Sequence, residues 1–247
     1  RRVLFRSNQR LPRDLELVSR FRPPLVITAL GSPRAAVAPV HAYGGLVFAD
    51  VTTPLLARKA IEAGADGLVL VCAGAGGHTG SLAAPAFIGE IRKFFDGPVV
   101  LAGSVANGKA IRAYQMLGAN LVYVGTSFIA ASESMAAPEH KQMLVDNDCE
   151  ALIATKAFTG ATANYLIPSI VAAGLDPKTL KDKDKIDASD PQNKTKAWKN
   201  IWSAGQAVGQ VRAVEPAAAI VERLAAQYAS TVRAAHEDRW SARVLGA

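Results

Sequence analysis

The feature that most constrains this fold is a regular alternation of short apolar segments with helix-forming segments, which begins at Pro24. The apolar segments are rich in Val, Leu and Ile, as expected for strands that are buried on both faces. Helix-forming segments of about ten residues separate them, which predicts parallel strands covered by helices. The expected strands are Leu25–Ala29, Leu46–Asp50, Leu68–Cys72, Pro98–Ala102, Leu121–Val124 and, more weakly, Ala151–Thr155.

Capping residues and helix breakers mark the segments between these strands as helices. Thr53 is a good N-cap, Pro54 suits the first helical position, and Gly64 can end the same helix. Trp198 and Trp202 are four residues apart, so on one helix they would share a face and pack the C-terminal part onto the main body. The expected helices are Pro33–Tyr43, Pro54–Ala63, Pro85–Phe95, Asn107–Leu117, Glu139–Asp146, Leu166–Ala173 and Pro216–Ala234.

Two α/β architectures fit this alternation, an open doubly wound sheet and a closed (β/α)8 barrel of the TIM type. Six strand–helix units can be counted from residue 25 onward, and a barrel needs two more. The chain opens without a methionine, and residues 2–7 (RVLFRS) resemble the translation of a sequencing adapter, which suggests a truncated reading frame. We therefore expect a barrel that lacks its first two β/α units and carries a C-terminal helical extension. The expected division is residues 1–24 as an N-terminal segment, 25–157 as the barrel units and 158–247 as the helical region.

Composition limits the class of protein. The chain has 247 residues, 50% of them hydrophobic, and no apolar run of about 18 residues that would indicate a membrane span. The formal charge of +7 comes partly from residues 178–199, where Asp alternates with Lys, and no aromatic residues are interleaved with basic ones as in a base-stacking surface. We expect neither a nucleic-acid nor a membrane partner. The two cysteines are far apart, which fits a reducing cytoplasm.

The segment Cys72–Gly80 (CAGAGGHTG) is the strongest candidate for a reactive site. It follows the apolar run Leu68–Val71, and its glycines allow a backbone to turn sharply and to approach a flat ligand closely. His78 lies within it, and an imidazole can accept or donate a proton near neutral pH. A loop histidine bonded only to a backbone carbonyl is the competing interpretation. The neighbouring Gly76 and Gly77 favour a functional role.

Two further glycine-rich loops follow the next two expected strands. Gly103 and Ser104 follow one, and Gly125 and Thr126 follow the other. In α/β proteins ligands bind beyond the carboxyl ends of the strands, and adjacent Gly/Ser turns at helix N-termini can form a phosphate site.

The other candidates have ordinary structural interpretations. Glu133 is expected to be a helix-capping or surface carboxylate, and Cys72 a buried strand residue. His41, His140 and His236 are expected to be structural or solvated. The sequence has no cluster with metal-ligand spacing, no G-x-S-x-G elbow and no Walker lysine motif, so metal-dependent, hydrolase and NTPase functions are not favoured.

These motifs together resemble those of the nitronate monooxygenases, formerly called 2-nitropropane dioxygenases. The resemblance extends from about residue 8 to the C-terminal helix. It is carried by Ala75–Gly80 (AGGHTG), Ala102–Ser104, Gly125–Ala130 with Glu133–Ser134, Phe158–Gly160, Asn164–Leu166 and Trp202–Gln206.

The resemblance implies an FMN-dependent (β/α)8 barrel that oxidises alkyl nitronates or nitroalkanes with O2 to carbonyl compounds and nitrite. His78 corresponds to the family's catalytic histidine, which abstracts the α-proton of a nitroalkane or orients a nitronate. The FMN-binding residues implied by the resemblance are Gly76 and Gly77 near the flavin ring and Gly103, Ser104, Gly125 and Thr126 around the phosphate. A flavin-dependent enoyl acyl-carrier-protein reductase and a flavin-binding fragment without turnover are the alternatives. The oligomeric state is left open.

Overall fold

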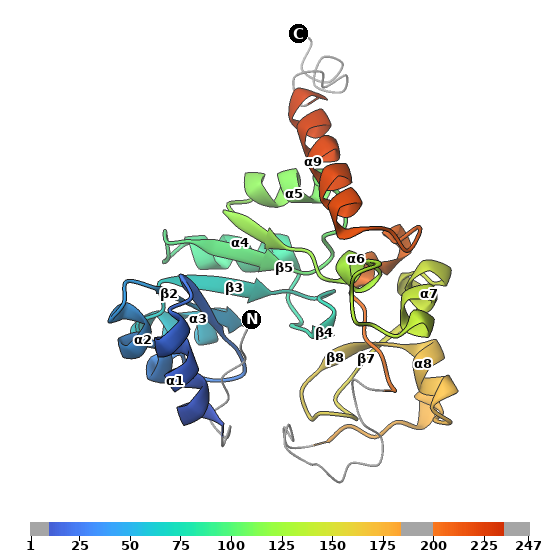
Figure 1. Ribbon diagram of the computed structural model, residues 1–247, viewed down its shortest axis with the longest axis horizontal. Helices are drawn as coiled ribbons and strands as arrows, with labels where there is room; N and C mark the ends of the chain where they lie inside the picture. The colour runs from blue at the N-terminus through green and yellow to red at the C-terminus, as the bar shows by residue number, and fades with distance from the viewer. Residues whose placement is uncertain (1–9, 184–199, 235–247) are drawn as a thin grey trace.

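A computed structural model describes residues 10–183 and 200–234 of the chain. Its centre is a five-stranded parallel sheet with the strand order β1-β2-β3-β5-β6 (Figure 1). Each strand lies beside the preceding strand of the same sheet, and the strand order does not reverse along the sheet. A doubly wound sheet reverses its strand order at a switch point, whereas a (β/α)8 barrel does not. The observed order is therefore that of a barrel, of which these are consecutive strands.

The strands agree closely with the predicted segments, because each is an apolar run bounded by turn residues. The bounds of the parallel strands are β1 Leu25–Thr28, β2 Leu46–Val51, β3 Gly67–Val71, β5 Val99–Ala102 and β6 Leu121–Tyr123. The helices that accompany them are α1 Leu11–Phe21, α2 Arg34–His41, α3 Pro54–Glu62, α4 Ala84–Arg92 and α5 Gly108–Met116. The capping prediction is confirmed at Thr53, whose hydroxyl oxygen accepts a hydrogen bond from the backbone N–H of Leu56 at 3.2 Å.

Alternate residues of each strand belong to different packing layers. Leu68 and Leu70 of β3 face a core formed with helices α3, α4 and α5, which contains Phe87, Ile88 and Ile91 of α4. Val69 and Val71 face the opposite side, where they pack with side chains of the neighbouring strands β2 and β5. Helices therefore cover one face of the sheet, and side chains from successive strands fill the other, as in a (β/α)8 barrel.

The prediction of a sixth parallel strand at residues 151–155 is wrong. This segment forms β7, Leu152–Thr155, which belongs to a separate three-stranded antiparallel sheet with the order β4-β8-β7. Its partners are β8, Ala163–Leu166, and β4, Gly77–His78. The turn at 158–160 is short enough to return the chain directly, so β7 and β8 pair with each other instead of joining the parallel sheet. Figure 1 shows this small sheet beyond the tip of β3.

The sequence had suggested a helical region for residues 158–247, but the described part of this region also contains a strand. Residues 163–166 are strand, so the helix expected from residue 166 is the shorter α8, Ile167–Ala172. Trp202 lies outside any helix and stacks on the ring of His140, with ring centroids 5.0 Å apart. Trp198 lies outside the described residues, so the shared helix face is not tested. The remaining helices are α6 Thr126–Ile129, α7 Pro138–Asp146, α9 Ala217–Ala234 and the 3-10 turns Cys149–Ala151, Pro177–Thr179 and Gln206–Gln210.

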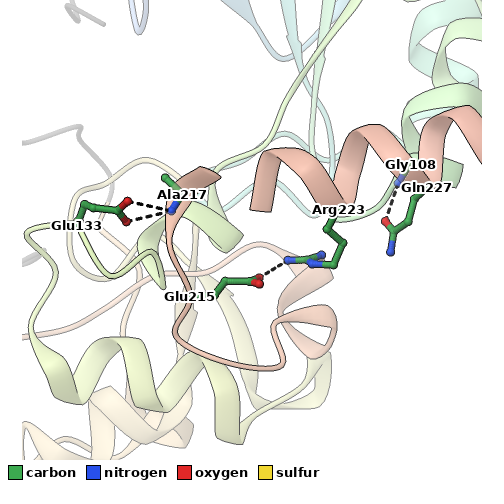
Figure 2. Close-up of polar contacts among 6 residues, drawn as sticks. All are labelled: Gly108, Glu133, Glu215, Ala217, Arg223 and Gln227. Atoms are coloured by element: carbon green, nitrogen blue, oxygen red, sulfur yellow. Dashed lines mark hydrogen bonds and ion pairs between the residues drawn. The ribbon is translucent and has the colours of Figure 1, made fainter. Parts of the chain in front are cut away.

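Helix α9 is attached to the body of the protein at its N-terminus and again beyond its middle (Figure 2). The Glu133 carboxylate accepts hydrogen bonds from the backbone N–H of Ala217, with the nearer oxygen at 3.0 Å. These bonds lower the pKa of Glu133 below its ordinary value, and they confirm its predicted role as a helix-capping carboxylate. Further along α9, Arg223 forms an ion pair with Glu215.

The crossing of α9 over α5 depends on a glycine. The backbone N–H of Gly108 donates to Oε1 of Gln227 at 3.1 Å, and a Cβ atom at position 108 would overlap the backbone nitrogen of Tyr228 (Figure 2). The two helix backbones are thus in direct contact at this point.

No helix among residues 10–183 and 200–234 is long and apolar enough to cross a membrane.

We predict that Gly108→Ala destabilises the protein by about 1–3 kcal/mol, since the added methyl group forces the two helix backbones apart. Gly89→Ala is the matched control, because Gly89 is also within a helix but its added Cβ meets no atom within 4 Å. This control should be neutral or stabilising by up to about 1 kcal/mol. Urea unfolding of both variants measures the difference, and equal stabilities would contradict the packing argument.

Candidate active site

The candidate site lies at the carboxyl ends of β3, β5 and β6. Because these strands are parallel and adjacent, the loops that follow them emerge at one edge of the sheet. The loops are residues 72–80, 103–107 and 124–126. The structure thus brings the three predicted glycine-rich loops to the same end of the barrel strands.

The first loop turns at two glycines with left-handed backbone, Gly74 at φ +87° and Gly77 at φ +71°. Between them, the carbonyl oxygen of Ala75 accepts a buried hydrogen bond of 2.8 Å from Nδ2 of Asn164 on β8. Residues 77 and 78 then pair with residues 164 and 163 as strands β4 and β8. The small antiparallel sheet therefore fixes the position of the loop from outside the barrel.

His78 is half-buried in β4, and its Nε2 atom lies 3.3 Å from Oγ1 of Thr159. Thr159 is buried in the turn between β7 and β8. The competing interpretation, a histidine bonded only to a backbone carbonyl, does not describe this contact with a side-chain hydroxyl group.

The second loop also needs an uncommon backbone. Gly103 has φ +135° and Ser104 has φ +55°, so two consecutive residues are in the left-handed region. The Ser104 hydroxyl oxygen occupies the position that a Cβ atom at Gly74 would need. The first and second loops are therefore in direct contact.

The third loop is joined to the first by a segment that comes from the C-terminal part of the chain. The backbone N–H of Gly205 donates to Oγ1 of Thr126 at 2.9 Å, and the N–H of Gln206 donates to the carbonyl oxygen of Gly74 at 2.9 Å. A Cβ atom at Gly76 would lie 2.7 Å from the nitrogen of Gly205, so the two backbones pass each other closely. By contrast, a Cβ atom at Gly125 would meet no atom within 4 Å.

Two groups near these loops have structural roles. Burial raises the pKa of the Cys72 thiol to about 12, so the thiol is protonated at neutral pH, as expected for a buried residue that takes no part in chemistry. His140 contacts the carbonyl oxygen of Ser203 through Nε2 at 3.3 Å, and burial lowers its pKa while this hydrogen bond opposes the change. His41 is exposed and pairs with Asp66 at 2.8 Å. His236 lies outside the described residues.

A cavity of about 390 Å³ lies beside α9 and is lined in part by Ala106 and Asn107 at the end of the second loop. Its lining includes Asn107 and Gln210, which bond to each other, and the Arg223–Glu215 ion pair. None of the seven residues predicted to form the site lines it. Most of its polar groups bind one another, so we do not assign it to the predicted site.

Sequence reasoning did not assign roles to Thr159, Asn164, Gly205 and Gln206. Each contacts the first or third loop only because the chain returns to the barrel after residue 150. A signal for them was present, since they lie in three of the segments that carry the family resemblance, 158–160, 164–166 and 202–206.

A barrel-type sheet with three glycine-rich loops and a half-buried histidine at its carboxyl edge defines an α/β protein of the TIM-barrel kind, with a candidate ligand site where this fold binds ligands. The profile of the nitronate monooxygenase family matches residues 2–227, and the chain belongs to this family. It is 28% identical over 221 residues to a nitronate monooxygenase of Paraburkholderia phytofirmans, covering 82% of this chain and 60% of that protein. It is 30% identical over 180 residues to a nitronate monooxygenase of Pseudomonas aeruginosa, and this match covers 67% of this chain and 51% of that protein.

Solved structures agree with this fold. A nitroalkane oxidase from Streptomyces ansochromogenes superposes with a TM-score of 0.71 at 27% identity, covering 89% of this chain and 68% of that one. FabK from Thermotoga maritima superposes with a TM-score of 0.77 at 21% identity, covering 95% of this chain and 77% of that one. This likeness concerns the fold alone. The chain spans about half the length of the curated relatives it matches.

We predict that Thr126→Val destabilises the protein by about 1–3 kcal/mol, because the buried N–H of Gly205 loses its acceptor. Thr126→Ser keeps the accepting oxygen and serves as the control, with a much smaller loss. Urea unfolding of the two variants decides the point. If the serine variant were the less stable of the two, the hydrogen bond would not be what holds the 205–206 segment in place.

Proposed function

We propose that this chain binds FMN and oxidises alkyl nitronates or nitroalkanes with O2 to carbonyl compounds and nitrite. The observation that carries the proposal is the convergence of His78 and three glycine-rich loops at one end of the parallel strands, in a member of the nitronate monooxygenase family. We further propose that the protein acts on small molecules in the cytoplasm. The division into an N-terminal segment, barrel units and a C-terminal region at residues 24/25 and 157/158 remains a prediction.

The residues present are compatible with FMN. The left-handed backbone at Gly103 and Ser104 and the open space at Gly125 suit a loop pair that admits a phosphate group. The N–H groups of Phe128 and Ile129 in α6 donate to the carbonyl oxygen of Gly125, which leaves those of Thr126 and Ser127 as the ones that could donate to phosphate oxygens. Gly76 and Gly77 precede His78 directly, which would place the flat ring of the flavin beside the histidine. When bound, FMN supplies the redox chemistry, for which protein side chains have no equivalent.

The contribution of the protein is then position and a proton site. A neutral nitroalkane must lose its α-proton before oxidation, and His78 is the residue we assign to accept it. A nitronate arrives already deprotonated, so the same side chain would only orient it by a hydrogen bond. The β4–β8 pairing and the contact with Thr159 hold the imidazole in place for both tasks.

The test of the proposed cofactor is a visible absorption spectrum of the purified chain after incubation with FMN and desalting. We expect a retained flavin spectrum that bleaches when a nitronate is added without oxygen. Loss of the flavin on desalting would contradict FMN binding by this chain. Retained flavin that is reduced by NADPH and reoxidised by an enoyl thioester, but not bleached by nitronate, would favour the enoyl reductase alternative.

We predict that His78→Asn lowers kcat/KM for neutral nitroalkanes by about 10²- to 10⁴-fold, the usual contribution of a positioned general base. Much of the activity with preformed nitronates should remain, since these need no proton abstraction. Steady-state oxygen consumption with both forms of one substrate measures the two effects. An equal loss with both would contradict the assignment of His78 as the base. The exposed His41 is a suitable control for replacement by Asn.

A further inference from the structure

The hydrogen bonds around Thr159 specify which nitrogen of His78 carries the hydrogen. The Thr159 hydroxyl donates to the carbonyl oxygen of Ala161 at 3.1 Å. A carbonyl oxygen can only accept, and a hydroxyl group has a single hydrogen. That hydrogen is therefore directed to Ala161, and Oγ1 presents lone pairs to its other neighbours.

Nε2 of His78 is one of these neighbours, at 3.3 Å from Oγ1. With the hydroxyl hydrogen directed elsewhere, the hydrogen bond requires Nε2 to be the donor. A neutral imidazole carries one N–H only, so its lone pair is then on Nδ1.

The surroundings of Thr159 keep this arrangement in place. Thr159 is only 7% exposed, and its turn is tightened by Gly160, which has φ +74° and whose N–H donates to the carbonyl oxygen of Lys156 at 2.8 Å. Beside it Phe158 packs edge-on against the fully buried ring of Tyr165, with centroids 4.8 Å apart. The hydroxyl group thus belongs to a packed turn, where it contacts the carbonyl oxygen of Ala161 and the side chain of Tyr165.

We propose that Thr159 is a positioning residue that holds neutral His78 as the Nε2–H tautomer, so that Nδ1 is the nitrogen that accepts the α-proton of the substrate. The part that concerns the substrate rests on the proposed function. The tautomer itself does not, since it follows from contacts within the protein. In this step the proton moves from the substrate carbon to Nδ1, and the electron pair of the C–H bond remains on the nitronate.

The test is NMR spectroscopy of the full chain with ¹⁵N-labelled histidine, recorded with and without FMN. The chain has four histidines, and the spectrum of His78→Asn identifies the signals of His78 by their absence. We expect the Nε2–H tautomer in the wild-type chain and in Thr159→Ser, and a mixture of tautomers in Thr159→Val. Thr162→Val, in the same connection between β7 and β8, is the control and should leave the tautomer unchanged.

Kinetics provide the second readout. Thr159→Val should lower kcat for a neutral nitroalkane by about 10- to 100-fold with little change in KM, because a misplaced base slows the chemical step. Thr159→Ser should keep most of the wild-type kcat for the neutral nitroalkane. Turnover of the nitronate should change little in either variant.

The outcomes separate the two hypotheses. An Nδ1–H tautomer in the wild-type chain, or an unchanged tautomer in Thr159→Val, overturns the role of Thr159 whatever the activities are. If the tautomer shifts as expected but both substrate forms lose activity equally, Thr159 still sets the tautomer and it is the base assignment of the proposed function that fails. If Thr159→Val does not fold, the wild-type and Thr159→Ser spectra decide the tautomer.

Discussion

The geometry of this site depends on the close approach of two backbones, that of the first glycine loop and that of residues 204–206. Gly74 and Gly76 face Gly205 and Gln206 so closely that a side chain on the facing glycines would separate them. The same short segment reaches Thr126 on the other side. Backbone hydrogen bonds have little freedom of direction, so they place the loops more accurately than flexible side chains would. This junction places Gly76 on the first loop and Thr126 on the third loop.

A second sheet gives the site its histidine. Strand β4 is only two residues long, and by itself it would have no reason to be extended. It is held by β8, which is held in turn by β7 and packs into its own small core with Phe158 and Ile201. The barrel strands therefore supply the loops, whereas the antiparallel sheet supplies the orientation of His78. Under the proposed function, the loops of the parallel sheet would bind the ligand and the antiparallel sheet would hold the proton-accepting histidine.

The parallel strands and most helices could be predicted from the sequence because their signals are local. An apolar run such as Leu68–Val71 is a strand wherever both faces are covered, and Thr53 caps a helix through a contact three residues away. The glycine-rich loops could be found for the same reason, since glycine marks a backbone that needs positive φ or a close neighbour, whereas the roles of the seven predicted site residues came from the family resemblance. Strand β8 was missed because its four residues (ANYL) form no apolar run and lead directly into α8. The partners Thr159, Asn164 and Gly205 could not be found by spacing, because each acts across about eighty residues of chain.

The difference in sequence separation between these contacts also affects the order in which parts of the chain can fold. Neighbouring strands β1 and β2 are connected by contacts between residues 20 apart, such as Thr28 and Phe48. The contacts of the site join residues 79, 81 and 89 apart. Contacts between distant residues close larger loops and cost more chain entropy, so they form late unless other structure has already brought them together. The parallel sheet can thus exist before His78 is in position, and the contact of α5 with α9, which joins Gly108 and Gln227 across 119 residues, closes a still larger loop.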